Sequence, residues 1–93
     1  MKKIVVLPSF ERSFNKLSAQ EKKLTTESLK RFNFMLVSKK IFVGLGFKKI
    51  NHDKYELRVN IRLRVIIKSE KDAYYLVLVG RHDEVRKYLR NYR

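Results

Sequence analysis

The residues of this sequence best suited to chemistry are arginines and a glutamate in its second half. Four of these residues occupy positions that differ by two or four, namely Glu56, Arg58, Arg62 and Arg64. An extended chain would therefore place them on one face. An arginine is always charged, and its planar group can hold two oxygens of one phosphate. These residue types at this spacing predict a site for phosphate groups, although alternating charge is also typical of a solvated sheet face.

A histidine supplies the proton chemistry that such a site would need. His82 follows Gly80 and Arg81 in a predicted turn, and an imidazole can give or take a proton near neutral pH. RNA can be cleaved without metal if a 2′-hydroxyl attacks the adjacent phosphorus, but the reaction needs a proton acceptor, a proton donor and cations around the phosphate. A surface histidine without a role is the plain alternative, and it is the favoured interpretation for His52.

Other kinds of site find little support in the sequence. The chain has no cysteine and only two histidines, so a metal site is not expected. The segment Gly44-Leu45-Gly46 lacks the further glycine and the preceding strand of a phosphate-binding loop. We therefore expect no metal and no cofactor.

Composition limits the domain count and suggests the partner. With 93 residues, of which 44% are hydrophobic, residues 1–93 form one domain with one modest core. Lys and Arg number 23 against 9 Asp and Glu, a formal charge of +14, and such an excess predicts a nucleic acid partner. An anionic membrane or an acidic protein would also attract it. The apolar runs are too short to span a bilayer and no secretory signal is recognisable, so we expect a cytoplasmic protein.

The first half of the chain reads as a strand and two helices. Ile4–Leu7 is a short apolar run that ends at Pro8, and Ser9 is the expected N-cap of the first helix. Ser18 and Glu21 have the spacing of a capping box. It opens a longer helix with an apolar stripe, formed by Leu24, Leu29, Phe32, Met35 and Leu36.

The second half reads as strands followed by a helix. Residues 47–50 and 55–59 are expected to pair, and alternation continues from Ile61 to Lys68. Tyr74 to Val79 is apolar on both faces and indicates a central strand. A last helix would pack through Val85, Tyr88, Leu89 and Tyr92. Lys48 and Lys49 then join the arginines and Glu56 in a cationic tray on the open face of an α+β fold.

These features together resemble the RelE/ParE toxin superfamily. The likeness covers nearly the whole chain and depends on the stretch Tyr55 to Ile67, the stretch Leu78 to Val85, and Tyr88. The resemblance implies a helical hairpin packed on a curved antiparallel sheet of four to five strands, with a short C-terminal helix. It also implies the toxin of a type II toxin-antitoxin pair, with a cognate antitoxin as partner. RelE-like members cleave mRNA, commonly on the ribosome.

The resemblance also assigns residues. Arg64 matches the phosphate-holding arginine, Glu56 and Arg58 match catalytic positions, and His82 lies at or beside the proton donor. Tyr88 matches the aromatic of the last helix. RNA contacts are expected from Lys48, Lys49, Arg62 and Arg81. Only Val59 to Ile61 is available for the turn between the arginine-bearing strands, which leaves the register of Arg58 against Arg64 open.

Two other functions remain open from the sequence. The ParE branch shares the fold and acts on DNA gyrase, and in that case His82 would be dispensable. A non-catalytic RNA-binding or ribosome-associated protein would need only the charge. Exposed aromatics among basic residues would favour this last function, and the pair Tyr74-Tyr75 is the one candidate.

Overall fold

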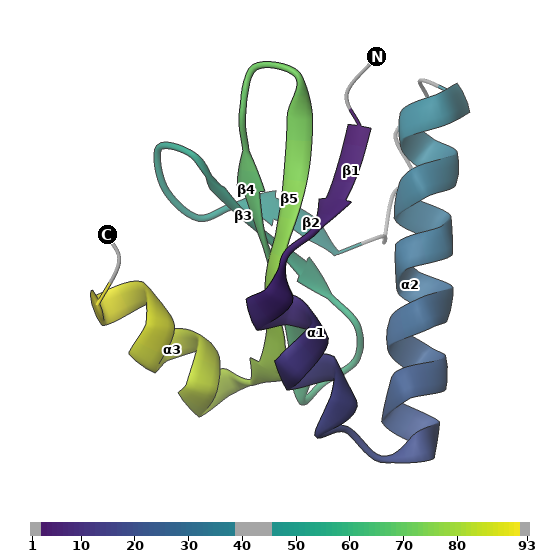
Figure 1. The fold of residues 1–93 in the computed structure, drawn as a ribbon, viewed down its shortest axis with the longest axis vertical. Coiled ribbons are helices and arrows are strands. Elements are labelled where there is room, and N and C mark those ends of the chain that lie inside the picture. The colour runs from purple at the N-terminus through teal and green to yellow at the C-terminus, as the bar shows by residue number, and fades with distance from the viewer. Residues whose placement is uncertain (1–2, 39–45, 92–93) are drawn as a thin grey trace.

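The computed structural model describes residues 3–38 and 46–91 and has the expected α+β order (Figure 1). Two helices follow the first strand, four strands come next, and a helix ends the chain. The elements are β1 (Lys3–Val6), α1 (Pro8–Asn15), α2 (Ala19–Ser38), β2 (Phe47–Lys49), β3 (Lys54–Arg58), β4 (Leu63–Ser69), β5 (Ala73–Arg81) and α3 (His82–Asn91).

The five strands form one sheet in the order β1-β5-β4-β3-β2. Neighbouring strands are antiparallel except β1 and β5, which are parallel. The sheet was expected to be antiparallel, but it is mixed. Two helices, α1 and α2, separate β1 from the other strands in the sequence, so β1 can pair in the parallel direction with β5 at the edge of the sheet. Val77 is an extra residue between the pairs Ile67–Leu76 and Ile66–Leu78. This bulge sets the register of the last part of β5.

Helices α1 and α2 pack on one face of the sheet. Their Phe10 and Phe32 are buried against Leu57, Val65 and Leu76 of the central strands. The capping box is confirmed: Glu21 accepts the backbone N–H of Ser18 at 2.9 Å, and Ser18 accepts that of Glu21 at 3.2 Å. In contrast, the predicted N-cap at Ser9 is wrong.

Helix α1 begins at Pro8, directly after Leu7. Proline at the first helical position has a φ angle already suited to a helix, so the helix begins one residue before Ser9. The hydroxyl of Ser9 instead donates to the carbonyl of Val77 at 2.6 Å, which ties α1 to the bulge in β5.

Aromatic rings fill the space between α2 and the sheet. Phe47 stacks on Tyr55 with ring centroids 4.9 Å apart, and Phe32 contacts both Phe47 and Tyr74. Tyr74 is thus part of the core. It is not an exposed platform for nucleic acid bases.

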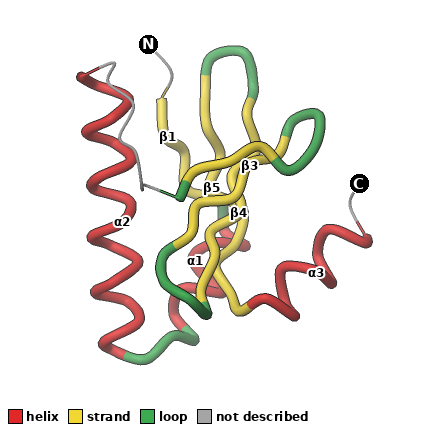
Figure 2. The backbone as a smooth tube through the Cα atoms, turned by 180° about the vertical axis from the view of Figure 1, so that it is seen from behind, coloured by secondary structure: helices red, strands yellow, loops and turns green. Residues whose placement is uncertain are grey.

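The other face of the sheet carries α3. Its Val85, Tyr88 and Leu89 pack on a cluster that includes Ile66 and Val77, as the apolar stripe predicted, while Tyr92 lies outside the described residues. Figures 1 and 2 show α3 leaving the end of β5 on the opposite side of the molecule from α2. The face predicted to be open is therefore partly covered by the last helix.

Candidate functional site

Strand register brings three of the predicted catalytic residues, Glu56, Arg58 and Arg64, together on the α3 face. Arg58 on β3 is directly opposite Arg64 on β4, and Lys48 on β2 is directly opposite Glu56 on β3. Directly paired residues point to the same side of a sheet. We call Lys48, Glu56, Arg58 and Arg64 the arginine cluster.

Two predicted members of the tray lie elsewhere. Lys49 is opposite Tyr55, whose ring stacks with Phe47 on the helix side, because successive side chains of a strand alternate between faces. Arg62 is not in a strand, since β4 begins at Leu63. The expectation that alternation starts at Ile61 is wrong for the same reason, and Ile61 is 76% exposed.

An Asx turn moves Ile61 and Arg62 out of the sheet. The Oδ1 atom of Asn60 accepts the backbone N–H groups of Arg62 and Leu63, both at 2.8 Å. Asparagine often organises turns in this way. The tight link between the two arginine-bearing strands is therefore a turn built by one side chain, and it fixes Arg58 opposite Arg64.

The cluster has a half-buried floor and an exposed rim. Glu56 Oε2 lies 3.5 Å from Arg64 Nε and 3.8 Å from Lys48 Nζ. The side chains of Glu56 and Arg64 are each 14% exposed, whereas that of Lys48 is 72% exposed. Arg58 is also exposed and makes no ion pair with any residue in the described ranges.

A second pair of cations on the same strands is neutralised differently. Lys54 is directly opposite Lys68, but Lys54 Nζ is 3.3 Å from Asp53 and Lys68 Nζ is 3.2 Å from Glu70. Each lysine thus pairs with its own carboxylate. In the arginine cluster, Glu56 pairs with both Arg64 and Lys48, and no carboxylate of the described residues pairs with Arg58. The excess of positive charge is concentrated at the Arg58 end of the strands.

Arg64 is held in place by two hydrogen bonds and one ion pair. Its Nη1 donates to the carbonyls of Asn60 at 2.7 Å and Leu63 at 3.1 Å, and its Nε faces Glu56. Within residues 3–38 and 46–91 its Nη2 has no partner. Arg64 is therefore oriented before any ligand arrives, with one nitrogen remaining for it.

Two glycines next to the cluster leave room for close neighbours, Arg58 at Gly46 and Glu84 at Gly80. Gly80 is directly opposite Arg64, and a Cβ atom there would come 3.1 Å from the Cβ of Glu84. Gly46 has a φ of +81°, and a Cβ atom there would come 2.9 Å from the Cβ of Arg58. Alanine would strain the backbone at Gly46 and crowd both positions.

His82 is the first residue of α3 and is exposed. It lies directly after the end of β5, two positions beyond Gly80, which is the residue opposite Arg64. The backbone N–H of Arg81 donates to Glu84 Oε1 at 3.1 Å, which fixes the start of the helix. The predicted proton donor and the predicted phosphate ligand therefore belong to neighbouring strand ends.

Tyr88 is half-buried in the apolar contact between α3 and the sheet. It also influences Lys68, whose pKa is raised first by its hydrogen bond to Glu70 and to a small extent by Tyr88. Lys68 is four positions along β4 from Arg64, roughly 13 Å at the usual rise per residue. Tyr88 thus has a clear packing role, and its catalytic role stays a prediction.

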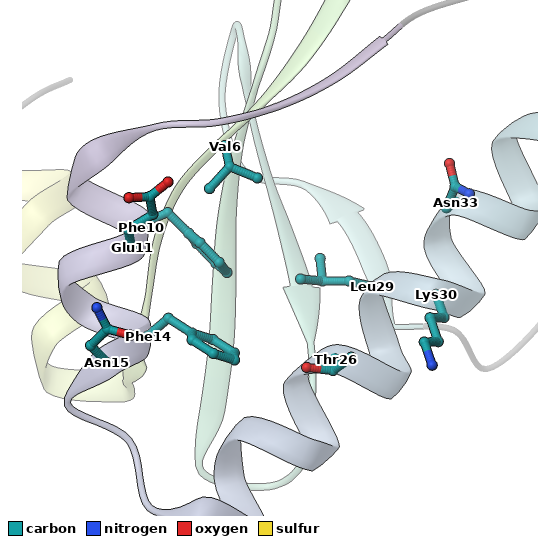
Figure 3. A pocket seen from close by; sticks show the side chains of 9 residues that line it. All are labelled: Val6, Phe10, Glu11, Phe14, Asn15, Thr26, Leu29, Lys30 and Asn33. Carbon is teal, nitrogen blue, oxygen red and sulfur yellow. The ribbon is translucent and has the colours of Figure 1, made fainter.

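An apolar groove lies on the other side of the molecule, between α1, α2 and β1 (Figure 3). Phe10, Phe14 and Leu29 form its floor in the view of Figure 3, and Val6, which is 46% exposed, lies at one end. Charged residues at its rim are Glu11 and Lys30. The groove offers contacts to apolar side chains of a partner.

Two features are absent from the described part of the chain. No helix there is both long and apolar enough to cross a membrane. No three His, Cys, Asp or Glu side chains in residues 3–38 and 46–91 are grouped as metal ligands would be.

Sequence reasoning missed two supports of the site. Asn60 orders the turn that carries Arg62 and also supplies a carbonyl to Arg64; an asparagine between two strands is a signal that would have found it. Gly46 abuts Arg58 and accepts its N–H at 2.9 Å. Nothing local in the sequence points to that contact, because the two residues meet only when β2 pairs with β3.

Comparison with known proteins identifies the fold. No protein-family model matches the sequence, and no curated protein sequence is significantly similar to it. Solved structures do match. The toxin-antitoxin complex RelB-RelE from Methanococcus jannaschii contains a chain with 16% identity, with 90% of this chain and 96% of that chain covered, at a TM-score of 0.70.

Two further structures agree with it. YafQ from Escherichia coli matches with 12% identity over 91% of this chain and 98% of that chain, at a TM-score of 0.67. The YoeB dimer from Staphylococcus aureus matches with 14% identity over 87% of this chain and 97% of that chain, at a TM-score of 0.64. The chain has the fold of the RelE-like toxins, as the resemblance in its sequence predicted.

Proposed function

We propose that this protein is the toxin of a type II toxin-antitoxin pair and a metal-independent endoribonuclease that cleaves mRNA on the ribosome in the cytoplasm. The fold supports a toxin. The single observation that carries the nuclease proposal is the arginine cluster, where Arg58 lies opposite Arg64 and three cations stand beside one carboxylate, which pairs with Arg64 and Lys48. Such an excess of cations suits a phosphate that gains charge in its transition state.

The proposed reaction is an attack of the ribose 2′-oxygen on the adjacent phosphorus. Glu56 takes the 2′ proton through Oε1, since both of its ion pairs use Oε2. Arg58 and Arg64 hold the non-bridging oxygens. The bond from phosphorus to the 5′-oxygen breaks, and His82 gives that oxygen its proton, which leaves a 2′,3′-cyclic phosphate and a free 5′-hydroxyl.

Lysine contacts in this mechanism differ from the sequence-based expectation. Both Lys48 and Lys49 were expected to contact RNA, but only Lys48 is beside the scissile phosphate in this mechanism, because Lys48 is the one that faces Glu56. Lys49 is exposed on the opposite side of the strand and would contact RNA only outside the cleavage site.

The deciding experiment is cell-free translation of a defined mRNA, with new 5′ ends mapped by primer extension. We expect discrete ends that require ribosomes, and their loss in His82→Ala and in Arg64→Ala. Lys71→Gln is the matched control, because Lys71 is exposed in the turn between β4 and β5 at the other end of the sheet. If translation or DNA supercoiling is inhibited while no RNA is cut, the nuclease function is refuted and ribosome binding or gyrase inhibition takes its place.

The proposed partner is an antitoxin with an acidic, amphipathic segment. A chain of charge +14 attracts acidic proteins, and an acidic segment over the arginine cluster would block RNA. The apolar groove between α1 and α2 could receive its apolar side chains. Co-expression with the product of a neighbouring small acidic reading frame should yield a stable complex that no longer cleaves mRNA, and failure to bind any such product would count against the pair.

A further inference from the structure

A basic groove lies at the β3–β4 turn, outside the arginine cluster. It has a volume of ≈ 390 Å³. Helix α2, the turn and the end of β5 all contribute to its wall, with Ser18, Gln20, Glu21, Leu24, Asn60, Ile61, Arg62 and Arg81 as the lining residues. Figures 1 and 2 both show the β3–β4 turn beside the α1–α2 connection, at the end of the sheet away from the β4–β5 turn.

The groove presents two cations that are available to a ligand. The Arg81 side chain is 64% exposed, and its Nη2 lies at a loose 3.9 Å from Glu21 Oε2. Arg62 is exposed and has no ion pair with a residue of the described ranges. One carboxylate thus faces two guanidinium groups. Glu21 is already engaged by the N–H of Ser18, which is the main cause of its lowered pKa, while Arg81 and Arg62 lower the pKa further.

An exposed apolar side chain stands beside these cations. Ile61 is 76% exposed, more than any other large hydrophobic residue in the described ranges. The Asx turn of Asn60 holds it there, because the turn fixes the next two residues outside the sheet. An ordered apolar residue between charged ones suits a ligand that has both anionic groups and flat apolar surfaces, and single-stranded nucleic acid has both.

The groove lies close to the arginine cluster along the chain, because Asn60, Ile61 and Arg62 of its lining belong to the turn that joins Arg58 to Arg64. Gly80 is opposite Arg64 and Arg81 is opposite Leu63, so neighbouring residues of β5 border the two sites on opposite faces. We propose that the groove binds the stretch of single-stranded RNA next to the scissile phosphate. Arg62 and Arg81 hold its phosphates, and Ile61 contacts a base. This inference rests on the proposed function insofar as RNA is the ligand of the cluster.

The test measures binding separately from cleavage. A fluorescent single-stranded RNA with 2′-O-methyl groups has no 2′-hydroxyl to attack, so its anisotropy reports binding alone. Its affinity is measured over roughly 50 to 200 mM salt. The variants are Arg62→Gln with Arg81→Gln, Ile61→Ser, and the control Lys3→Gln with Lys71→Gln, which removes the same charge from exposed sites at the other end of the sheet. Circular dichroism melts establish that each variant is folded.

We expect the double arginine variant to reduce the slope of log affinity against log salt by about 1.4, the value for two lost phosphate contacts on a single strand. The lysine control should change it by less than half as much. Ile61→Ser should weaken binding roughly three- to tenfold at an unchanged slope, since an apolar contact does not depend on counterions.

Several outcomes would overturn the inference. Equal slopes for the arginine and lysine variants would mean that the groove contributes only general charge. If the groove variants lose binding to a poly-glutamate peptide while their RNA binding is intact, the groove is a site for an acidic protein. The proposed function can fail separately. If the protein binds RNA as expected but cuts no mRNA, the nuclease function is refuted and the groove remains as an RNA site. If mRNA is cut normally but the double arginine variant leaves the salt slope unchanged, only the groove is refuted.

Discussion

Arg58 and Arg64 stand directly opposite each other across the antiparallel strands β3 and β4, and only Arg64 is paired with a carboxylate among the described residues. Like charges in this position destabilise a sheet. The chain keeps both, although at the other end of the same strands Lys54 and Lys68 each have an acidic partner. An unbalanced pair of this kind is expected where a fold gives up stability for the binding of an anion.

Replacing Arg58 should therefore stabilise the protein and inactivate it. We expect Arg58→Gln to raise the free energy of unfolding by about 0.2–1 kcal/mol, the range for cross-strand pairs, and to reduce mRNA cleavage at least tenfold. Urea denaturation and primer extension measure the two effects. Lys68→Gln is the control; it removes the bond to Glu70 and should not stabilise. A destabilised Arg58→Gln would contradict the strain argument.

Glu56 can be tested by a substitution that keeps its shape. Glu56→Gln removes the one carboxylate between Lys48 and Arg64, so RNA with 2′-O-methyl groups should bind several-fold more tightly. If Glu56 takes the 2′ proton, cleavage at saturating substrate should fall by about 10²-fold or more. Tighter binding with undiminished cleavage would show that Glu56 only balances charge and that another group is the base.

His82 is assigned to the leaving oxygen, and this role has a chemical test. His82→Ala should lower the cleavage rate by about 10²- to 10⁴-fold. A substrate with sulfur in place of the bridging 5′-oxygen needs no proton on its leaving group, so His82→Ala should cleave it nearly as fast as the unchanged protein does. If the sulfur substrate gives no rescue, His82 is not the proton donor.

Parts of this site were accessible from sequence because they depend on local pattern. Alternation predicted that Glu56 and Arg58 point to one face of the sheet and Tyr55 and Leu57 to the other. The strand pairs confirm this arrangement. The capping box needed only the spacing of two residues. Alternation failed for Lys49, because two adjacent lysines carry no information on which of them faces the site.

Other parts depend on contacts between distant segments. Ser9 bonds to Val77 and Gly46 abuts Arg58, and neither partner can be chosen before the sheet order is known. The parallel pairing of β1 with β5 is of the same kind. Arg62 was misplaced because the side chain of Asn60 ends the alternation before β4 begins.

The capping box predicts how stability depends on pH. The N–H of Ser18, followed by its hydroxyl and by Arg81, holds the pKa of Glu21 below the ordinary value. The folded state thus favours the ionised carboxylate, so this contribution is complete above the ordinary glutamate pKa of about 4.3 and is lost as the pH falls through the lowered value. Glu21→Gln should be less stable than the unchanged protein at pH 7, with a difference that shrinks in acid.

Thermal melts across this pH range provide the measurement, and Glu27→Gln is the control because Glu27 is exposed on the same helix. Ser18→Ala should lower the free energy of unfolding by about 1 kcal/mol, the usual loss of an N-cap. A difference for Glu21→Gln that persists unchanged at low pH would mean that the carboxylate charge does not stabilise α2.

Asn60 offers a way to separate the geometry of the turn from its charge. Its Oδ1 accepts two backbone N–H groups at 2.8 Å, so Asn60→Ala should lower the free energy of unfolding by about 1–2 kcal/mol. Asn60→Asp keeps the acceptor and should stay close to the unchanged protein in stability. The same aspartate adds a negative charge at a residue that contacts the backbone of Arg62 and the side chain of Arg64. It should therefore weaken the binding of 2′-O-methyl RNA, while alanine should leave the salt slope nearly intact.

Stability, measured by urea denaturation, and RNA affinity, measured by anisotropy, should therefore rank the two Asn60 variants in opposite orders. Alanine is expected to be the less stable and the better RNA binder, and aspartate the more stable and the poorer binder. If aspartate is as unstable as alanine, the acceptor role of Oδ1 is wrong. A carboxylate placed close to ligand-binding arginines must compete with phosphate for them. If both variants nevertheless bind RNA like the unchanged protein, the charge around the turn does not contribute to the RNA site.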